Sequence, residues 1–104
     1  MSKRIHKFTI SDEQLATVLN IEAENHTNEV GVKMPIDAQI LAIRTVNMKP
    51  RIFALVDMEA KAEERKFEVY PTGVDIPVAD TENGFTYVGS FARNGKTFHV
   101  LEGS

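Results

Sequence analysis

The sequence contains no cysteine and no apolar segment long enough to cross a membrane. Without cysteine the chain has no disulfide framework, no thiolate metal site and no cysteine nucleophile. A membrane-spanning helix needs about 20 mostly apolar residues, and the cations of residues 1–7 are not followed by the apolar core of a secretory signal. A disulfide-free chain of this kind is typical of a reducing compartment. We therefore predict a cytoplasmic protein without membrane contact.

An excess of positive charge is also absent, because 12 lysines and arginines stand against 15 aspartates and glutamates. General nucleic-acid binders carry a cationic surplus, since phosphate neutralisation supplies most of their affinity. The net charge of −3 therefore predicts no general nucleic-acid binding. The length of 104 residues suits one domain and no linker or repeat divides the chain, so we expect a single domain over residues 1–104.

Motifs of catalysis and cofactor binding are missing as well. The three histidines, His6, His26 and His99, have no second ligand at the spacing of a helix-borne metal site, and there is no phosphate-binding glycine loop or dinucleotide fingerprint. We therefore predict no metal site, no cofactor and no catalytic residue. Ser90 beside His99 is the nearest approach to a nucleophile and a base, but it lacks a nucleophile-elbow sequence. A small hydrolase is the third hypothesis for function.

One segment has the signals of a helix. Ser11 is a favourable N-cap, Gln14 occupies the capping-box position, and the acidic residues 12–13 suit the first turn because the helix dipole attracts anions there. These features predict one helix near residues 12–23. Its apolar stripe is formed by Leu15, Val18, Leu19 and Ala23.

Alternating apolar and polar residues predict six or seven short strands in the rest of the chain. Turn residues rather than long helices separate these strands, which favours antiparallel pairing over a parallel sheet. Residues 74–84 have the composition of a loop. The predicted fold is mainly β in the α+β class: a curved sheet, small barrel or sandwich of mostly antiparallel strands, with the helix covering a side or an end. The strand segments are residues 5–10, 30–34, 36–47, 51–57, 66–70, 87–93 and 96–102.

The most specific turn signal is Asn94-Gly95, the preferred pair for a type I′ turn because both central residues need positive φ. Regular pairing from this turn places Tyr87 on one face of the hairpin and His99 on the other. A second turn is expected at residues 70–73, with Pro71 in its second position. The pairs predicted for the hairpin are Phe91–Phe98, Ser90–His99, Gly89–Val100, Val88–Leu101 and Tyr87–Glu102.

Arginines and aromatic residues near turns are the candidate ligand-binding groups. The planar guanidinium donates two parallel hydrogen bonds to a phosphate, and an aromatic ring can stack on a base. Arg44 or Arg51 in one pocket with Tyr70 would form a nucleotide site, whereas on strand edges the same charges would only prevent edge-to-edge association. The sequence leaves both interpretations open. The predicted ligand-binding residues are Arg44, Arg51, Arg65, Tyr70, Thr72 and His99.

Several short motifs follow one another along the second half of the chain: Ala54-Leu55-Val56-Asp57, Glu64-Arg65-Lys66-Phe67, Tyr70-Pro71-Thr72-Gly73, Tyr87-Val88-Gly89-Ser90-Phe91 and Phe98-His99-Val100. This ordered set resembles a family of small uncharacterised proteins of phages and prophages. The sequence departs from that family at Phe53, where the family tends to have tryptophan, and at residues 15–27, which look like an insertion. The resemblance implies an accessory protein made inside a bacterial cell. Small phage accessory proteins often neutralise host defences by blocking a host protein or by sequestering a signalling nucleotide, and the resemblance implies this context.

The leading hypothesis is a non-catalytic binding protein that captures a small phosphorylated or nucleotide ligand. Its basis is the arginines near aromatic turns, the absence of catalytic motifs and the context that the resemblance implies. The alternative is a protein-interaction module that inhibits or adapts a host or phage protein through a sheet edge or the helix. The predicted partners are therefore a small anionic ligand or a host protein. A homo-oligomer is expected because small β-rich domains with short edges often close their sheets by association.

Overall fold

The computed structural model describes residues 2–76 and 84–103 of the chain. Over these residues the backbone forms seven strands and one helix, which confirms the prediction of a mainly β fold in the α+β class. Residues 77–83 of the predicted loop 74–84 lie outside the described residues. In chain order the elements are β1 (Arg4–Thr9), α1 (Asp12–Leu19), β2 (Glu29–Pro35), β3 (Gln39–Val46), β4 (Lys49–Val56), β5 (Ala62–Pro71), β6 (Phe85–Arg93) and β7 (Lys96–Gly103).

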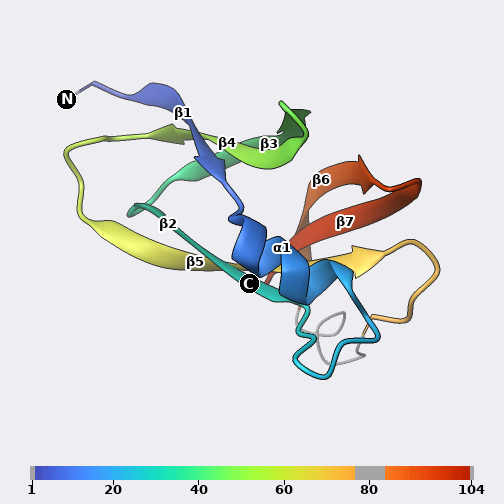
Figure 1. Cartoon of the computed structure of the whole chain (residues 1–104). Helices are drawn as coiled ribbons and strands as arrows, with labels where there is room; N and C mark the ends of the chain where they lie inside the picture. The colour runs from blue at the N-terminus through green and yellow to red at the C-terminus, as the bar shows by residue number, and fades with distance from the viewer. Residues whose placement is uncertain (1, 77–83, 104) are drawn as a thin grey trace.

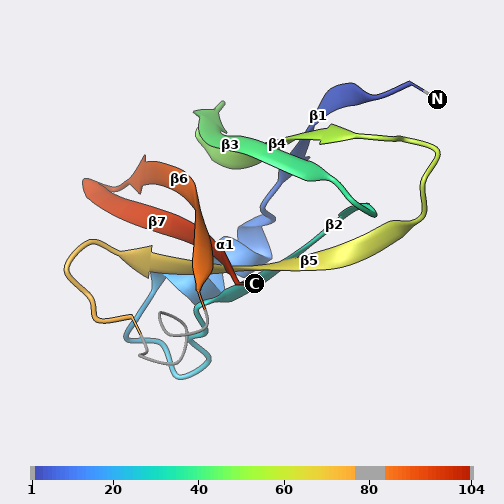
Figure 2. The same ribbon diagram turned by 180° about the vertical axis from the view of Figure 1, so that it is seen from behind.

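The strands form two antiparallel sheets that face each other (Figure 1). One sheet has three strands in the order β1-β4-β3, and the other has four strands in the order β2-β5-β7-β6. The three-stranded sheet lies above the four-stranded sheet in both views, and α1 lies against one side of the pair (Figures 1 and 2). Neither sheet closes on itself, so the sandwich is the correct one among the predicted architectures.

The hydrophobic core lies between the sheets because alternate residues of each strand point inward. On β4, Ile52 and Ala54 are buried, whereas Phe53 and Leu55 remain partly exposed on the outer face. The same alternation buries large side chains of β5 and β7. Each fully buried large apolar side chain contributes about 1.5–3 kcal/mol, so apolar burial on the inner faces holds the sheets together. The inward residues of β5 and β7 include Phe67, Val69, Phe98 and Val100.

α1 begins at the predicted residue. The Ser11 side chain accepts a hydrogen bond from the Gln14 backbone N–H at 3.2 Å, which satisfies one of the free donors of the first turn. The Gln14 side-chain amide donates to the Gly31 carbonyl on β2 at 2.7 Å. Leu15 and Val18 are buried in the core. The helix is therefore fastened to the four-stranded sheet by one polar contact and by its apolar stripe.

α1 ends at Leu19, so the predicted extent to residue 23 is too long. Asn20 leaves the helical conformation with φ −96° and ψ 88°. Its backbone carbonyl accepts from the Ala23 N–H at 3.1 Å, and its side chain accepts from the Glu22 N–H at 3.2 Å. Asparagine side chains compete in this way with helical hydrogen bonds. A turn therefore follows the helix, although Ala23 continues the apolar spacing.

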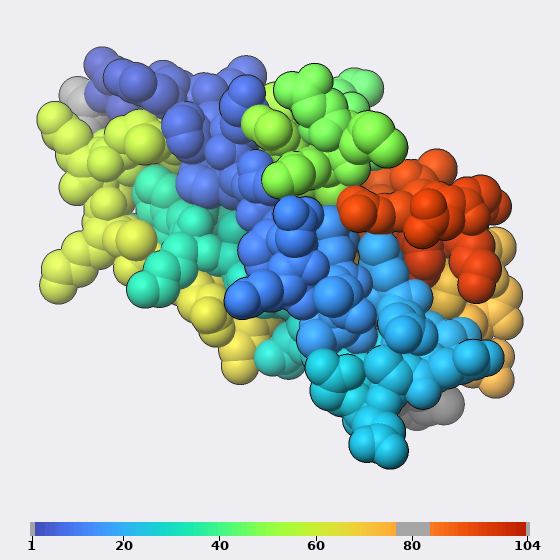
Figure 3. Space-filling view, viewed as in Figure 1, coloured from blue at the N-terminus to red at the C-terminus, as the bar shows by residue number. Residues whose placement is uncertain are grey.

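Two tight hairpins meet α1 at one end of the molecule. The β3–β4 turn uses Asn47 and Met48, whose φ angles of 52° and 66° fit type I′ geometry. The β6–β7 turn uses Asn94-Gly95 as predicted, with φ of 52° and 77°. The Arg93 guanidinium donates to the Met48 carbonyl at 3.3 Å, which ties the two hairpin tips together. The space-filling view shows the β6–β7 hairpin beside both α1 and the β3–β4 hairpin (Figure 3).

A bulge in β6 changes the register of the last hairpin. Tyr87 does not lie opposite Glu102 as predicted, because the pairing shifts by one residue between Tyr87 and Gly89. Gly89 has φ 153°, and a Cβ at this position would lie 2.7 Å from Cγ2 of Ile43 on β3. Glycine therefore permits both the bulge and the close approach of the two sheets. The shift moves Tyr87 to the face that carries His99. The observed pairs are Phe91–Phe98, Ser90–His99, Gly89–Val100 and Tyr87–Leu101.

The turn after β5 lies one residue beyond the predicted position. The Pro71 carbonyl accepts from the Val74 N–H at 3.3 Å, so Pro71 is the first residue of the turn rather than the second. Gly73 holds φ 91° at the third position, as a type II turn requires. Thr72 therefore takes the second position, and its N–H donates to the Thr97 carbonyl at 3.0 Å. This hydrogen bond holds Thr72 beside β7.

Candidate functional site

The structure divides the six predicted ligand-binding residues among three places. Three of them lie together on the outer face of the four-stranded sheet, one lies between the sheets, and two arginines lie on the outer face of the three-stranded sheet. Of the two interpretations that the sequence left open, a pocket shared by Arg44 or Arg51 with Tyr70 is therefore not formed among the described residues. Tyr70, Thr72 and His99 lie on the outer face of the four-stranded sheet. Arg65 lies between the sheets, and Arg44 and Arg51 lie on the outer face of the three-stranded sheet.

Thr72, His99 and Tyr87 form a hydrogen-bonded group that we call the His99 cluster. Thr72 Oγ1 lies 2.6 Å from Nε2 of His99, and Tyr87 Oη lies 2.7 Å from Nδ1. Hydroxyl groups thus occupy both ring nitrogens. Ser90 is opposite His99 in the register, but no hydrogen bond joins the two side chains in the part of the chain that the structure describes. The geometry gives no support to a Ser90–His99 nucleophile and base.

Three elements bring the His99 cluster together. His99 lies in β7, a central strand of the four-stranded sheet. Thr72 lies in the turn after β5, and β5 pairs with β7 so that Tyr70 is opposite His99. Tyr87 joins the cluster only because of the bulge at Gly89. Tyr87 was not among the six predicted residues, although glycine inside a strand is a sequence signal for such a bulge.

The His99 cluster has one more hydrogen-bond donor than it has short hydrogen bonds. A neutral imidazole carries one N–H and each hydroxyl group carries one O–H, which makes three donors for the two short contacts. Thr72 Oγ1 also lies 3.4 Å from the Thr97 carbonyl, which is long for a hydroxyl donor. With the imidazole N–H on Nε2, the Thr72 hydroxyl is therefore left with only this long contact as its acceptor among residues 2–76 and 84–103. The hydrogen of this hydroxyl group is available to a ligand.

The His99 cluster forms part of the wall of a cavity of about 240 Å³. Tyr70 and Leu101 also line it and are only 4% and 2% exposed, although they lie outside the main core. Phe85 and Tyr87 line it with rings that are 41% and 53% exposed. The cavity thus combines a buried apolar floor, exposed aromatic rings and a hydroxyl donor. This set of groups is suited to stacking on a planar ring and hydrogen-bonding its edge.

A second cavity of about 340 Å³ adjoins the first at the turn after β5. Pro71, Thr72 and Val74 line both cavities, so this turn is their common wall. Lys96 lines the second cavity and forms no ion pair with any residue that the structure describes. The cavity that Lys96 lines and the aromatic cavity therefore border the same turn.

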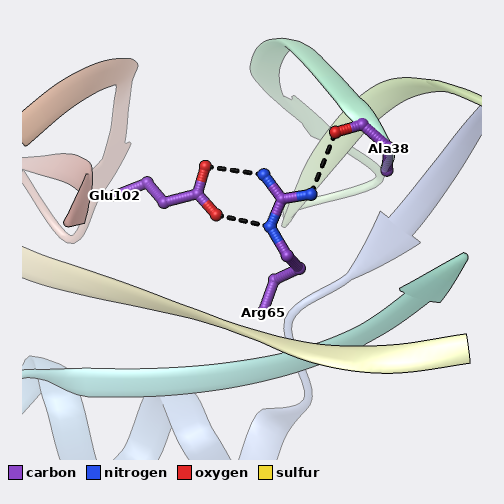
Figure 4. A network of polar contacts seen from close by, with 3 residues as sticks. All are labelled: Ala38, Arg65 and Glu102. Atoms are coloured by element: carbon purple, nitrogen blue, oxygen red, sulfur yellow. Dashed lines mark hydrogen bonds and ion pairs between the residues drawn. The ribbon is translucent and has the colours of Figure 1, made fainter. Parts of the chain in front are cut away.

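Arg65 is held in a polar network between the sheets (Figure 4). Its Nε and Nη2 groups donate to the two carboxylate oxygens of Glu102 at 2.6 and 2.8 Å, and its Nη1 group donates to the Ala38 carbonyl at 2.9 Å. The side chains of Arg65 and Glu102 are only 21% and 17% exposed. The hydrogen bond to Glu102 raises the pKa of the Arg65 guanidinium, although burial acts to lower it. Arg65 therefore links β5, β7 and the segment before β3.

The described part of the chain contains no group of three histidine, aspartate or glutamate side chains that could hold a metal ion. In the same part of the chain, no helix has the length and apolar character needed to span a membrane. The His99 cluster contains an imidazole and two hydroxyl groups and no carboxylate. These groups can donate hydrogen bonds to a ligand and accept them from it.

The fold and the cavity define a small sandwich-like α+β protein with a hydrogen-bonding pocket on one outer face. The family model for a domain of unknown function, DUF7352, matches residues 1–104, so the chain belongs to this family. This membership agrees with the resemblance to an uncharacterised family, and the phage origin stays a prediction. No curated protein and no solved structure matches the chain.

Proposed function

We propose that the chain is a non-catalytic binding protein that captures a small phosphorylated ligand with a planar ring, such as a nucleotide, in the cavity beside the His99 cluster. The observation that carries this proposal is the hydroxyl hydrogen of the cluster that has no short acceptor. The hydroxyl groups of the cluster are exposed, so a ligand acceptor would replace water or the long contact of Thr72 with the Thr97 carbonyl. The ring nitrogens and carbonyl groups of a nucleobase are acceptors of the required kind.

The size and lining of the cavity support a ring ligand. Its volume of about 240 Å³ is below the range of about 300–1,000 Å³ that is usual for drug-sized ligands, so one ring system is the appropriate size. Phe85 and Tyr87 offer exposed aromatic rings at this cavity. Stacking of a base on such a ring contributes about 1–3 kcal/mol.

Lys96 is the cation that we assign to the phosphate group. It lines the neighbouring cavity, which shares Thr72 with the aromatic one. Lysine binds phosphate as a point charge and needs no bidentate geometry. This assignment replaces Arg44 and Arg51, which lie on the opposite sheet, and Arg65, which donates to Glu102 and Ala38.

The cellular setting of the proposal comes from the resemblance to phage and prophage proteins. A binding protein of this kind, made in the bacterial cytoplasm, would act as an accessory factor that sequesters a signalling nucleotide and so counters a host defence. A homo-oligomer belongs to the same proposal. The native mass spectrum described next addresses the captured ligand and the number of subunits.

A native mass spectrum of the protein purified gently from bacterial cells is the first test. We expect a mass above the denatured mass by a few hundred daltons per subunit, and fragmentation of that excess identifies the ligand. The same spectrum reports the number of subunits. An excess of several kilodaltons would instead indicate a protein partner and would favour the alternative function.

Calorimetric titration with the four ribonucleoside monophosphates tests the site itself. We expect Tyr87→Phe and Thr72→Val each to weaken binding of the preferred nucleotide about tenfold, because each removes one hydroxyl group from the cluster. Lys96→Gln should weaken binding of the monophosphate and leave binding of the matching nucleoside unchanged. His26→Gln is the matched control, because His26 contacts the Val18 carbonyl at 3.2 Å, outside the cavity. Equal affinities for all four variants would contradict the site.

The second candidate function is protein interaction through the edge of β1. In the part of the chain that the structure describes, β1 pairs only with β4, so its other edge is open to strand addition. Ile5 on this strand is 61% exposed. A co-purified protein that is released by Ile5→Lys, with no change in nucleotide binding, would favour this function.

A further inference from the structure

The outer face of the three-stranded sheet has a regular arrangement of charged and aromatic side chains. Alternate residues of β1, β4 and β3 point away from the core, and antiparallel pairing aligns them in rows across the strands. We call this surface the arginine face. Its three rows are Thr9–Arg51–Arg44, Lys7–Phe53–Ala42 and Ile5–Leu55–Gln39.

The charges of the arginine face are not balanced within it. Arg44 is directly opposite Arg51, and Lys7 lies in the neighbouring row. None of these three cations forms an ion pair with a residue in the described ranges, and the three rows contain no acidic residue. Like charges opposite each other destabilise a sheet. An anion bound between them would remove this penalty.

One nitrogen atom of Arg51 also lacks a hydrogen-bond partner. Its Nε group is buried and has no hydrogen-bond partner among the residues that the structure describes. A buried donor without a partner is unusual in a folded protein and calls for a missing acceptor. A surface-bound phosphate meets the guanidinium side chain, and it reaches this buried Nε only if the side chain shifts.

No helix or strand of the described residues covers the arginine face, which lies on the side of the three-stranded sheet that faces away from the core (Figures 1 and 2). Phe53 lies in the middle row, between Lys7 and Ala42, and remains partly exposed. An open sheet with an aromatic ring among cations is the type of surface on which unpaired bases stack while the backbone contacts the charges.

We propose that the arginine face binds single-stranded nucleic acid, independently of the function proposed for the cavity. Arg44, Arg51 and Lys7 contact phosphates, and a base stacks on Phe53. A duplex hides its bases and cannot use Phe53, so binding is confined to single strands. This restriction is compatible with the net charge of −3, which disfavours general nucleic-acid binding.

Fluorescence anisotropy with a labelled 12-nucleotide oligothymidylate tests the proposal on the whole chain. The key variants are Arg44→Gln with Arg51→Gln, and Phe53→Leu. The matched control is Lys33→Gln with Lys61→Gln, which removes the same charge from positions outside the arginine face. Circular dichroism confirms that each variant is folded, and the nucleotide titration described above is repeated on each as an independent readout.

We expect the double arginine variant to bind the oligonucleotide at least tenfold more weakly. For this variant, the slope of the logarithm of the binding constant against the logarithm of the salt concentration should become shallower by about 1.4, because two phosphate contacts to a single strand are lost. Phe53→Leu should weaken binding at least fivefold without changing the salt slope. The lysine control should stay within twofold of the original protein. Nucleotide binding in the cavity should be the same in all variants.

Three results would overturn the proposal. The first is a folded original protein that does not bind the oligothymidylate. The second is equal binding of a DNA duplex or of polyglutamate, which would show that the surface attracts any polyanion. The third is unchanged affinity in Phe53→Leu, which would show that no base stacks there. None of these results bears on the cavity of the His99 cluster, so the two proposals fail separately.

Discussion

The outer faces of the two sheets differ in how their polar groups are satisfied. On the four-stranded sheet, Thr72 and Tyr87 contact His99 at 2.6 and 2.7 Å. On the three-stranded sheet, Arg44 and Arg51 face each other, and the described residues provide no counter-charge. Hydrogen bonds within the protein satisfy most polar groups of the His99 cluster, whereas no contact within the described residues balances the charges of Arg44 and Arg51. The two faces should therefore respond in opposite ways when a polar group is removed.

The bulge at Gly89 is the feature on which the first face depends, and its loss should have the largest effect. In Gly89→Ala, alanine must adopt φ 153° and its Cβ meets Cγ2 of Ile43 at 2.7 Å. Strain and overpacking each cost about 1–3 kcal/mol, so we expect the free energy of unfolding in urea to fall by about 3 kcal/mol. Gly31→Ala is the control, because its Cβ meets only the flexible end of the Glu64 side chain. Equal losses in both variants would contradict the role of the bulge.

Loss of the Arg65–Glu102 pair, which links the two sheets, should have the second-largest effect on stability. Glu102→Gln should lower the free energy of unfolding by about 2 kcal/mol, because a neutral amide cannot accept both hydrogen bonds from the Arg65 guanidinium. Thermal unfolding of Glu102→Gln, Arg65→Met and the double variant measures the coupling, and the double variant should lose less than the sum of the single losses. Lys66→Met is the control, since it breaks only the exposed contact of Lys66 with Glu29 at 3.6 Å. Additive losses would show that the two side chains do not act together.

The contribution of the Arg65–Glu102 pair to stability should not change between neutral and mildly alkaline pH. The pKa of Arg65 is raised in the folded protein, so its contribution to stability is complete below the ordinary arginine pKa and is lost only as the pH rises through the higher, folded value. The difference in unfolding free energy between the original protein and Arg65→Met should therefore be the same at about pH 7 and pH 9. A difference that shrinks over this interval would argue against the raised pKa.

Loss of one hydroxyl group from the His99 cluster should have a moderate effect. Tyr87→Phe should lower the free energy of unfolding by about 1 kcal/mol, the usual contribution of a single hydrogen bond. Ser90→Ala is a sharp control, because Ser90 is opposite His99 in the register without bonding to it, and its stability should change by less than about 0.5 kcal/mol. Chemical denaturation of both variants provides the comparison. A larger loss for Ser90→Ala would mean that the cluster is wrongly assigned.

The smallest effect, with the opposite sign, is expected on the arginine face. Arg44→Gln removes the charge opposite Arg51 and should raise the free energy of unfolding by about 0.5 kcal/mol at low salt. High salt should abolish the gain, because it screens exposed charges. Lys33→Gln is the control, since Lys33 is opposite the acidic Glu64, and this change should not stabilise the protein. A loss of stability in Arg44→Gln would show that the pair of arginines is already balanced.

Local features of the fold were predictable because neighbouring residues produce them. The N-cap at Ser11 and the turn at Asn94-Gly95 depend on hydrogen bonds and backbone angles within a few residues. The predicted end of the helix was wrong because the apolar spacing continues to Ala23, whereas the Asn20 side chain favours a turn. The strands and their antiparallel pairing followed from the alternation of apolar residues.

The candidate site was predictable only in part. Tyr70, Thr72 and His99 lie together as parts of one cavity, whereas the arginines assigned to the same ligand lie elsewhere. Alternation places a residue on a face of its strand, but it does not say which two strands are neighbours. The pairing of β5 with β7, which brings Thr72 to His99, joins segments that are separated by β6 in the sequence.

The amino-acid order alone determines the strand content, the start of the helix, the tight turns and the lack of cysteine chemistry, because each depends on composition or on residues close in the chain. The assembled molecule decides the strand order, the place of Tyr87 beside His99, the partnership of Arg65 with Glu102 and the exposure of the arginine face. These features depend on a single bulge at Gly89 and on contacts between distant strands. A shift of one residue reverses the face of a side chain, and local sequence patterns do not control that shift.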